Sequence, residues 1–356
     1  MAVGENNNAG RRPARRRRVA ILAAGSTALA LFAAESAVRL FELGPATYQP
    51  TRIDPPGGIP FDVSDDAFFV YQPNKTFSYL YDPAGDSRGY LGPAGRVTYE
   101  INPFRMRGPA VPVEKGAGSF RVVCLGDSFT FGEGVHYPDT YPARLETLLR
   151  KATPNRSVEV LNAGVQGYGT KFAVRFYLSY CRQFQPDVVT LGFFLNDASD
   201  VHETVRDHVA MTEPPPLSGA AGVSRLWSIV ERGRYARRVQ GDYFETTRRS
   251  FDSEEWRICQ DLLGGMREAG KLEGFRFVVI IFPILWELDG AYPFEDIHER
   301  IRAACRAADC EWIDMLDTYR GRRAESLWIH PTDQHPNEIA HDLAAETIAQ
   351  YLSASP

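Results

Sequence analysis

Short apolar runs that end at glycine or polar residues alternate with helical patterns from about residue 118 to the end of the chain. Five of these runs predict buried strands, and the stretches between them predict helices because their apolar residues recur on one face. This alternation predicts an α/β domain over residues 118–356, a three-layer α/β/α structure with a central, mostly parallel sheet. The predicted strands are 121–125, 158–162, 187–194, 275–282 and 311–314, and the predicted helices are about 140–151, 170–182, 253–270, 294–308 and 336–352.

Two regions depart from the alternation. Residues 42–117 are rich in Pro, Gly and Tyr with short alternating stretches, which predicts a linker followed by a small β-rich lead-in. Residues of about 200–250 contain three consecutive prolines and a basic amphipathic stretch, 223–239, which predicts an insertion over the strand ends. A lid over the site and a plain surface helix are both compatible with this pattern, and contact with a membrane surface is a further alternative.

The N-terminal pattern differs again, because six arginines within residues 11–18 precede an uncharged stretch, 19–34, and the chain continues apolar to Val38 after the single charge of Glu35. Since about 20 apolar residues span a bilayer, we expect a basic cytoplasmic tail at 1–18 and an uncleaved, single-pass signal-anchor helix at 19–41. Arginines favour the cytoplasmic side, which would place everything after Leu43 in the periplasm or outside the cell. A cleaved signal peptide and a buried core helix are the alternatives.

Composition adds few constraints. The 356 residues are 44% hydrophobic and 24% charged, as in ordinary globular proteins, and the net charge of -5 gives no indication of a nucleic-acid partner. The five cysteines show no CxxC pair and no metal-ligand spacing, and none has a catalytic context. In an exported domain, Cys305 and Cys310 are close enough in sequence to form a disulfide.

A candidate nucleophile follows the first predicted strand. Ser128 lies in the run 126–134 (GDSFTFGEG), in the turn that leads from the strand towards a helix, where its hydroxyl would face the open edge of the sheet. Serine needs a base within hydrogen-bond reach to act as a nucleophile. Residue 130 is Thr, so the GxSxG elbow of α/β-hydrolases is not satisfied.

Among the seven histidines, His335 is the best candidate for that base, because Asp333 precedes it by two positions in a predicted loop. Such an Asp could orient the imidazole through Nδ1 and favour the imidazolium. The alternative makes Asp333 a helix cap and His335 a surface residue. His330 is the second candidate for the base, and Asp314 the second candidate for the acid.

Hydrolysis through a tetrahedral intermediate also needs hydrogen-bond donors for the oxyanion. The loop after the second strand supplies the backbone N–H of Gly167, with Gly164 as the alternative, and the loop after the third strand supplies the side-chain amide of Asn196. Each loop alone is more often a simple turn. All three loops fall on one edge of the predicted sheet, which favours a common site.

These blocks resemble the GDSL, or SGNH, hydrolase family, in the order serine, glycine, asparagine, histidine, over about residues 118–356. The resemblance implies the flavodoxin-like SGNH hydrolase fold and, with the N-terminal segment, a membrane-anchored bacterial envelope type. It also implies that Ser128 is the nucleophile, His335 its base and Asp333 the partner of His335. The oxyanion hole would comprise the backbone N–H of Ser128, Gly167 and Asn196.

Two departures from the family pattern concern the last two blocks. Three residues separate Gly192 from Asn196, where the family usually has Gly-x-Asn-Asp, and the usual Asp position three before His335 is Thr332. The Asp-x-His spacing resembles the branch that includes alginate O-acetyltransferases of the bacterial envelope. The departures leave the identity of the acid open.

The sequence therefore predicts an esterase that hydrolyses carboxylic esters, O-acetyl or other acyl, through an acyl-enzyme, on a small-molecule or glycan substrate. No metal and no organic cofactor is expected. An O-acyltransferase that modifies an envelope or extracellular glycan is the first alternative, since the same acyl-Ser128 would pass its group to a sugar hydroxyl. A catalytically silent glycan-binding protein on the same fold is the second.

Overall fold

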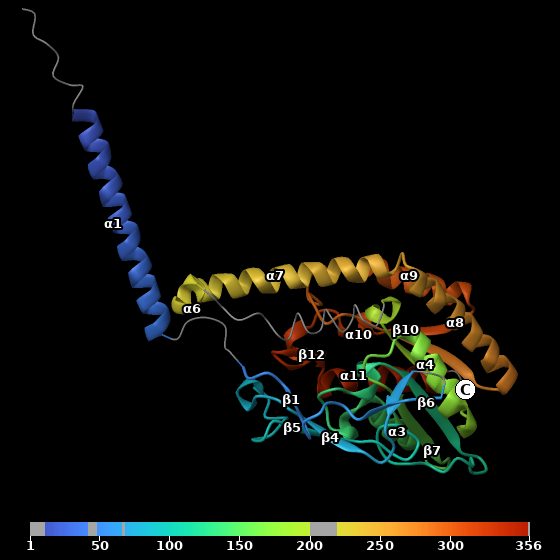
Figure 1. Ribbon diagram of the computed structural model, residues 1–356. Helices are drawn as coiled ribbons and strands as arrows, with labels where there is room; N and C mark the ends of the chain where they lie inside the picture. Colours follow the sequence, from blue (N-terminus) through green and yellow to red (C-terminus); the bar gives the residue numbers. More distant parts are fainter. Residues whose placement is uncertain (1–10, 42–47, 66–67, 200–218, 355–356) are drawn as a thin grey trace, which may run out of the picture. The chain divides into compact units, whose positions relative to one another are not determined.

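The computed structural model describes residues 11–41, 48–65, 68–199 and 219–354 (Figure 1). The described residues fall into two compact units, which are treated separately below. The first contains the N-terminal helix and the residues from 219 to Gln240, and the second contains the residues from Tyr48 to 199 and from Gly241 onward. His202 and His208, and the start of the expected insertion at 200–218, lie outside the described residues.

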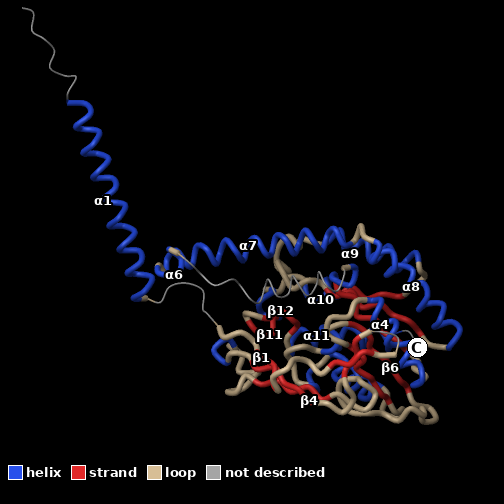
Figure 2. The backbone as a smooth tube through the Cα atoms, viewed as in Figure 1, coloured by secondary structure: helices blue, strands red, loops and turns tan. Residues whose placement is uncertain are grey.

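A five-stranded sheet forms the centre of the second unit, in the order β10-β9-β8-β6-β7, and every neighbouring pair is parallel. Strands are drawn in red in Figure 2. The three inner strands are apolar and almost completely buried, as expected for strands covered on both faces. The prediction of a three-layer α/β/α fold with a parallel sheet is confirmed. The strands are β6 (Phe120–Gly126), β7 (Val158–Gly164), β8 (Val188–Phe194), β9 (Arg276–Phe282) and β10 (Glu311–Asp314).

Helices cover both faces of this sheet because the chain reverses its direction across the sheet after β7. α3 packs against α11, and α4 and α9 each pack against α8. The longer helices are α3 (Tyr141–Ala152), α4 (Thr170–Phe176), α8 (Glu254–Glu273), α9 (Glu295–Ala307) and α11 (Glu338–Ala354), and α2 (Ser128–Phe131) and α10 (Met315–Tyr319) are short. α4 continues as a π-helical turn, η3 (Tyr177–Cys181), and five 3-10 turns complete the unit: η1 (Pro83–Gly85), η2 (Tyr137–Asp139), η4 (Arg182–Phe184), η5 (Leu195–Ala198) and η6 (Ala324–Leu327).

The last helix begins later than the sequence predicts. Pro336 belongs to β12 (Asp333–Pro336), which pairs antiparallel with β11 (Trp328–His330), and α11 starts at Glu338. Asn337 caps the helix, because its Oδ1 accepts from the N–H groups of Ile339 and Ala340, both at 3.1 Å. Asp333 is therefore not the cap of this helix.

Residues 48–107 form two small antiparallel sheets in the second unit, β1-β4-β5 and β2-β3. Phe77, Tyr79 and Tyr81 recur with the two-residue period of a strand and are all buried. The N–H of Arg107 donates to the carbonyl of Asn162 in β7 at 3.2 Å, which ties this segment to the central sheet. The strands are β1 (Arg52–Asp54), β2 (Phe61–Val63), β3 (Phe69–Tyr71), β4 (Thr76–Leu80) and β5 (Arg96–Glu100).

In the first unit, α1 (Arg11–Leu40) is one continuous helix whose stretch Arg15–Leu40 is long and apolar enough to cross a membrane. The arginines expected in a separate tail are thus part of the helix from Arg11 on. α6 (Ala220–Val223) is followed by α7 (Arg225–Ser250), of which the residues up to Gln240 belong to this unit. Glu35 of α1 accepts hydrogen bonds from Ser224 Oγ and the first N–H groups of α7. The basic stretch of the expected insertion is therefore a helix.

All five cysteines are buried free thiols. Cys310 Sγ lies 3.4 Å from the carbonyl oxygen of Leu263, and the disulfide that its spacing from Cys305 would allow is not formed. Burial raises the pKa of both thiols, to about 12 for Cys305 and about 11 for Cys310. These residues pack in the core as small apolar side chains.

Candidate active site

Ser128 lies at the carboxyl end of β6, where the strand turns sharply into α2. Gly126 has a φ of 148°, and a Cβ there would lie 2.3 Å from Thr130 Oγ1, so only glycine fits this turn. Asp127 caps α2 by accepting the N–H of Phe129 at 2.9 Å. Ser128 is the first residue of the helix, and its hydroxyl faces the edge of the sheet.

His335 and Asp333 reach this serine from β12. His335 Nε2 lies 2.9 Å from Ser128 Oγ, and His335 Nδ1 lies 2.6 Å from Asp333 Oδ1. Asp333 Oδ1 also accepts the N–H of His335 at 3.1 Å. The Asp-x-His spacing works because both residues lie in one extended segment, where the carboxylate can reach both the backbone and the ring of His335.

Five further side chains extend the network of this histidine, and the sequence patterns did not indicate them. Tyr81, just after β4, donates to Asp333 Oδ2 at 2.8 Å. Glu133 Oε2 lies 3.8 Å from His335 Nε2 and accepts from Gln166 Nε2 at 2.5 Å. The amide of Gln166 is fixed in turn by two lead-in hydroxyls, those of Tyr71 and Tyr79, each at 2.9 Å.

The protonation of this group follows from burial and charge. Burial would lower the pKa of His335, but the negative charges of Glu133 and Asp333 raise it to about 10. Burial would raise the pKa of Asp333, but the charge of His335 and the hydrogen bonds from His335 and Tyr81 hold it well below its usual range. Burial raises the pKa of Asp127. The site is therefore built to stabilise a positive charge on His335.

Two glycines, one at the end of β7 and one in the loop that follows it, differ in the hydrogen bonds of their backbone N–H groups. The N–H of Gly164 donates to Asn162 Oδ1 at 3.1 Å, and a Cβ on Gly164 would lie 2.2 Å from the backbone N of Phe131, so this glycine lets α2 pack on β7. Gly167 is exposed, has a φ of 78°, and its N–H makes no hydrogen bond to any described residue. Of these two N–H groups, that of Gly167 is the one left without a partner among the described residues.

Asn196 lies in η5, directly after β8. The neighbouring Asp197 is buried and accepts from the hydroxyl of Thr170 at 2.7 Å and from the N–H of Phe194 at 3.2 Å, which fixes the turn. Asn196 Oδ1 is buried and has no hydrogen-bond partner among the described residues. The turn thus holds a half-buried amide, Asn196, in the loop that follows the third strand along the chain.

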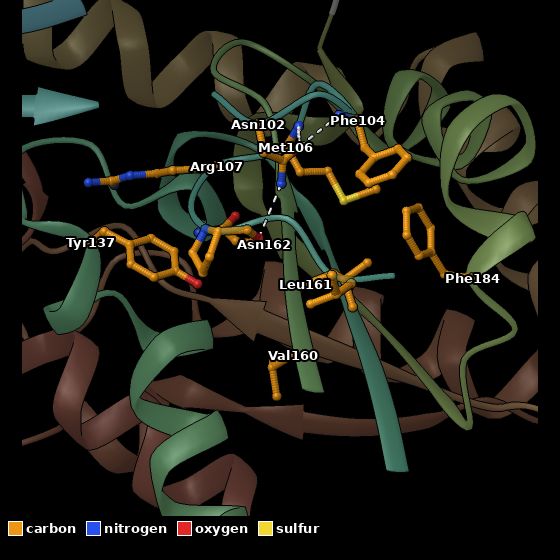
Figure 3. Close-up of a pocket in the computed structure, with 11 residues that line it drawn as sticks. Asn102, Phe104, Met106, Arg107, Tyr137, Val160, Leu161, Asn162 and Phe184 are labelled. Atoms are coloured by element: carbon orange, nitrogen blue, oxygen red, sulfur yellow. Dashed lines mark hydrogen bonds between the residues drawn. The ribbon is translucent and has the colours of Figure 1, made fainter. Parts of the chain in front are cut away.

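The carbonyls at the end of α2 are held by a buried arginine. Arg107 donates to the carbonyl oxygens of Phe131, Gly132 and Val135 at 2.6 to 2.7 Å, which satisfies groups that a short helix leaves unpaired. Figure 3 shows Arg107 beside Asn162 at a small pocket that does not include Ser128. Arg107 therefore stabilises the segment that directly follows Ser128, through hydrogen bonds to its carbonyl oxygens.

Glu133, Asp333 and His335 bring three possible metal-ligand atoms within 4.8 Å of one another. However, His335 uses Nδ1 for Asp333 and Nε2 for Ser128, so a metal would have to displace one of these contacts. The donor set fits hydrogen bonding to the histidine better than it fits metal ligation.

The family model of the GDSL-like lipase/acylhydrolase family matches residues 124–343. The chain belongs to this family. As a GDSL-like acylhydrolase it is an ester-hydrolysing enzyme. The matched residues contain the turn with Ser128, the loops that follow β7 and β8, and β12. The lead-in with Tyr71, Tyr79 and Tyr81 lies before it.

Several solved structures resemble this acylhydrolase. A putative lipolytic protein of the G-D-S-L family from Desulfitobacterium hafniense DCB-2 is 13% identical with a TM-score of 0.39, covering 65% of this chain and 99% of that protein. Axe2, an acetylxylan esterase from Geobacillus stearothermophilus, is 13% identical with a TM-score of 0.40, covering 65% and 94%. A two-domain esterase active on acetylated mannans is 15% identical with a TM-score of 0.41, covering 67% and 50%. No curated protein matches the chain.

The second candidates for base and acid of this acylhydrolase lie in other networks. His330 Nε2 lies 3.0 Å from the carbonyl oxygen of Asp82, and its Nδ1 lies 2.7 Å from Thr332 Oγ1. Asp314 binds His298 Nδ1 at 2.9 Å and Arg302 at 2.7 Å, in a cluster at the end of β10. Neither residue bonds to Ser128 or His335, so the geometry favours His335 and Asp333 over these two.

The cluster around Asp314 predicts a stability effect. Asp314→Asn should destabilise the protein by about 3 kcal/mol, because it removes the carboxylate that bonds to the fully buried ring of His298 and one of the carboxylates that pair with Arg302. Ester turnover per folded molecule should not change. Thermal unfolding of the detergent-solubilised chain measures the difference, and equal unfolding temperatures would contradict it.

The pH dependence of this effect has a definite sign. His298 and Arg302 lower the pKa of Asp314 against the effect of burial. The stabilisation is therefore present above the unfolded-state pKa of about 3.9 and is lost as the pH falls through the lower folded-state value. The difference between the two proteins should shrink only below about pH 4.

Proposed function

We propose that this acylhydrolase cleaves carboxylic esters through an acyl-enzyme on Ser128, with His335 as base and Asp333 as its orienting acid. The observation that carries the proposal is the continuous chain of contacts from Ser128 Oγ through both ring nitrogens of His335 to Asp333, at 2.9 and 2.6 Å. A nucleophile, a base and an orienting group within hydrogen-bond reach are what nucleophilic catalysis requires.

The steps follow from this geometry. Neutral His335 accepts the hydroxyl proton as Ser128 Oγ attacks the ester carbon, and His335 then gives that proton to the leaving alcohol as the C–O bond breaks. The N–H of Ser128, the N–H of Gly167 and the amide of Asn196 are the proposed donors to the oxyanion. Water then attacks the acyl-enzyme while His335 accepts its proton. His335 returns that proton to Ser128 Oγ as the ester bond to Ser128 breaks, and the carboxylic acid is released.

The substrate class is part of the same proposal. Among the resembling structures, Axe2 is an acetylxylan esterase and another acts on acetylated mannans. We infer that this chain removes O-acetyl or other short acyl groups from a glycan or a small molecule. α1 would anchor it in the membrane with the basic end cytoplasmic and the hydrolase domain periplasmic or extracellular, since basic residues favour the cytoplasmic side.

A single-turnover experiment tests the acyl-enzyme and separates hydrolase from acyltransferase. The full chain in detergent is mixed with a chromogenic acetyl ester, with and without acetyl-free glycan, and quenched at intervals for mass analysis. We expect a transient acetyl group on Ser128 whose loss releases acetate with or without glycan. Loss that needs the glycan and acetylates it would establish the acyltransferase, and absence of acetyl on Ser128 would refute the proposal.

A further inference from the structure

Glu133 is a buried carboxylate that faces the reacting nitrogen of His335. It follows Ser128 by five residues, just after α2, and its side chain is 10% exposed. Its Oε2 lies 3.8 Å from His335 Nε2, the nitrogen that is 2.9 Å from Ser128 Oγ. Asp333 occupies the other side of the ring, at Nδ1. The imidazole therefore lies between two carboxylates.

The position of Glu133 is fixed by residues that have no part in the acyl-transfer steps. Gln166 Nε2 donates to Oε2 at 2.5 Å, and the hydroxyls of Tyr71 and Tyr79 hold the amide of Gln166 in place. In the described part of the chain, His335 is the one ion-pair partner of Glu133. A buried carboxylate without Lys or Arg is unfavourable unless it acts on a positive charge nearby, and here that charge is on His335.

We propose that Glu133 is a second carboxylate for His335 and keeps the proton on Nε2 until the pH is alkaline, so that this active site works best above neutrality. The inference rests on the proposed function of His335 as the base. Glu133 contacts neither the substrate nor Ser128 in this scheme and acts through His335, so it is a positioning residue.

The electrostatic surroundings of His335 support this proposal. The groups that face it are Asp333 from β12 with the hydroxyl of Tyr81 behind it, Asp127 at the start of α2, Glu133, and His341 from α11. Burial lowers the pKa of His341, which is therefore neutral. The negative charges exceed the effect of burial and raise the pKa of His335 to about 10. At neutral pH the imidazolium donates to Ser128 Oγ and cannot accept its proton.

The same charge assists the reaction once His335 is neutral. When Nε2 takes the proton from Ser128, a positive charge appears between Asp333 and Glu133 and is stabilised from both sides. The proton then moves from Nε2 to the leaving oxygen as the C–O bond breaks, and no further reactant is needed. Glu133 therefore lowers the cost of the imidazolium and moves the working range to higher pH.

Glu133→Gln tests the proposal because it removes the charge and keeps the shape. We measure kcat/KM on an acetyl ester against pH, together with the rate of inactivation by a serine-reactive phosphonate, which also needs neutral His335. In both profiles the rate falls on the acidic side as His335 becomes protonated, and we call this fall the acidic limb. In the variant the acidic limb should lie at a pH lower by at least about 1 unit. Well below the wild-type limb, the variant should therefore react about tenfold faster than wild type, and on the alkaline plateau it should react more slowly.

Two further variants complete the test. Glu133→Asp keeps the negative charge but places it farther from His335, so its acidic limb should lie between those of wild type and Glu133→Gln. If Glu133→Gln does not fold, Glu133→Asp replaces it in the comparison with wild type. Glu311→Gln, which removes a carboxylate paired with Arg276 at the opposite end of the sheet, should leave the limb in place.

The outcomes separate this inference from the proposed function. The role of Glu133 is refuted if the acidic limbs of wild type and Glu133→Gln coincide within about 0.3 pH unit. If Glu133→Gln is unfolded, the role is refuted when the acidic limbs of wild type and Glu133→Asp coincide. The acyl-enzyme on Ser128 then still stands. If Ser128→Ala retains turnover and phosphonate labelling, the proposed function itself fails.

Discussion

Ser128→Ala should reduce kcat/KM for ester hydrolysis by about 10⁴-fold or more, because no other group can form the acyl-enzyme. The loss should appear at every pH, since neutral His335 would then have no hydroxyl to activate. Labelling by a serine-reactive phosphonate should disappear with it. Ester turnover, and mass analysis of the labelled protein, measure both effects.

The fold should survive this substitution. Among the described residues, the side chain of Ser128 bonds to His335 alone, and the cap of α2 uses Asp127 and the N–H of Phe129. Ser326→Ala, which removes a hydroxyl bonded to the carbonyl of Arg323, is the matched control and should keep wild-type activity. Unchanged labelling of Ser128→Ala would show that another residue is the nucleophile.

The sheet was predictable because its strands are continuous apolar runs. Such runs are buried on both faces whatever their neighbours, so β6, β8 and β9 could be read from local sequence. The start of the last helix could not, because Pro336 fits the first turn of a helix as well as the end of a strand. Pairing of β12 with β11, a tertiary contact, decides between the two.

The site was predictable to the extent that its residues follow the ends of strands. Ser128, Gly167 and Asn196 follow successive strands of the sheet, and β12 brings His335 to Ser128 over a separation of 207 residues. The lead-in tyrosines could not be found in this way, since nothing local connects Tyr81 with Asp333, 252 residues away. The short alternating stretches within 42–117 predicted a small β-rich lead-in but not what it contacts.

Asp333→Asn should reduce kcat by about 10² to 10⁴-fold, the largest effect expected after loss of the serine. The amide oxygen can still accept a hydrogen bond from Nδ1–H, but the uncharged side chain no longer stabilises the imidazolium that forms when Ser128 attacks. Steady-state kinetics of the variant measure the loss. A kcat within about threefold of wild type would show that Asp333 is not the acid.

Tyr81→Phe is the companion to this variant, because the lost hydroxyl is the donor to Asp333 Oδ2. It should reduce kcat by about tenfold, with KM unchanged, since the carboxylate loses one hydrogen bond and its orientation. Tyr90→Phe, which removes a hydroxyl bonded to Asp139, should have no such effect. A role for Tyr81 in folding alone would lower stability and leave kcat unchanged.

The pH profiles then separate the two carboxylates of His335. Removing either charge should move the acidic limb to lower pH, because both raise the pKa of His335. Only Asp333 also fixes the ring through Nδ1, so Asp333→Asn should lose far more of the alkaline plateau than Glu133→Gln. Equal plateau losses would mean that the two carboxylates share one electrostatic role and that ring orientation contributes little.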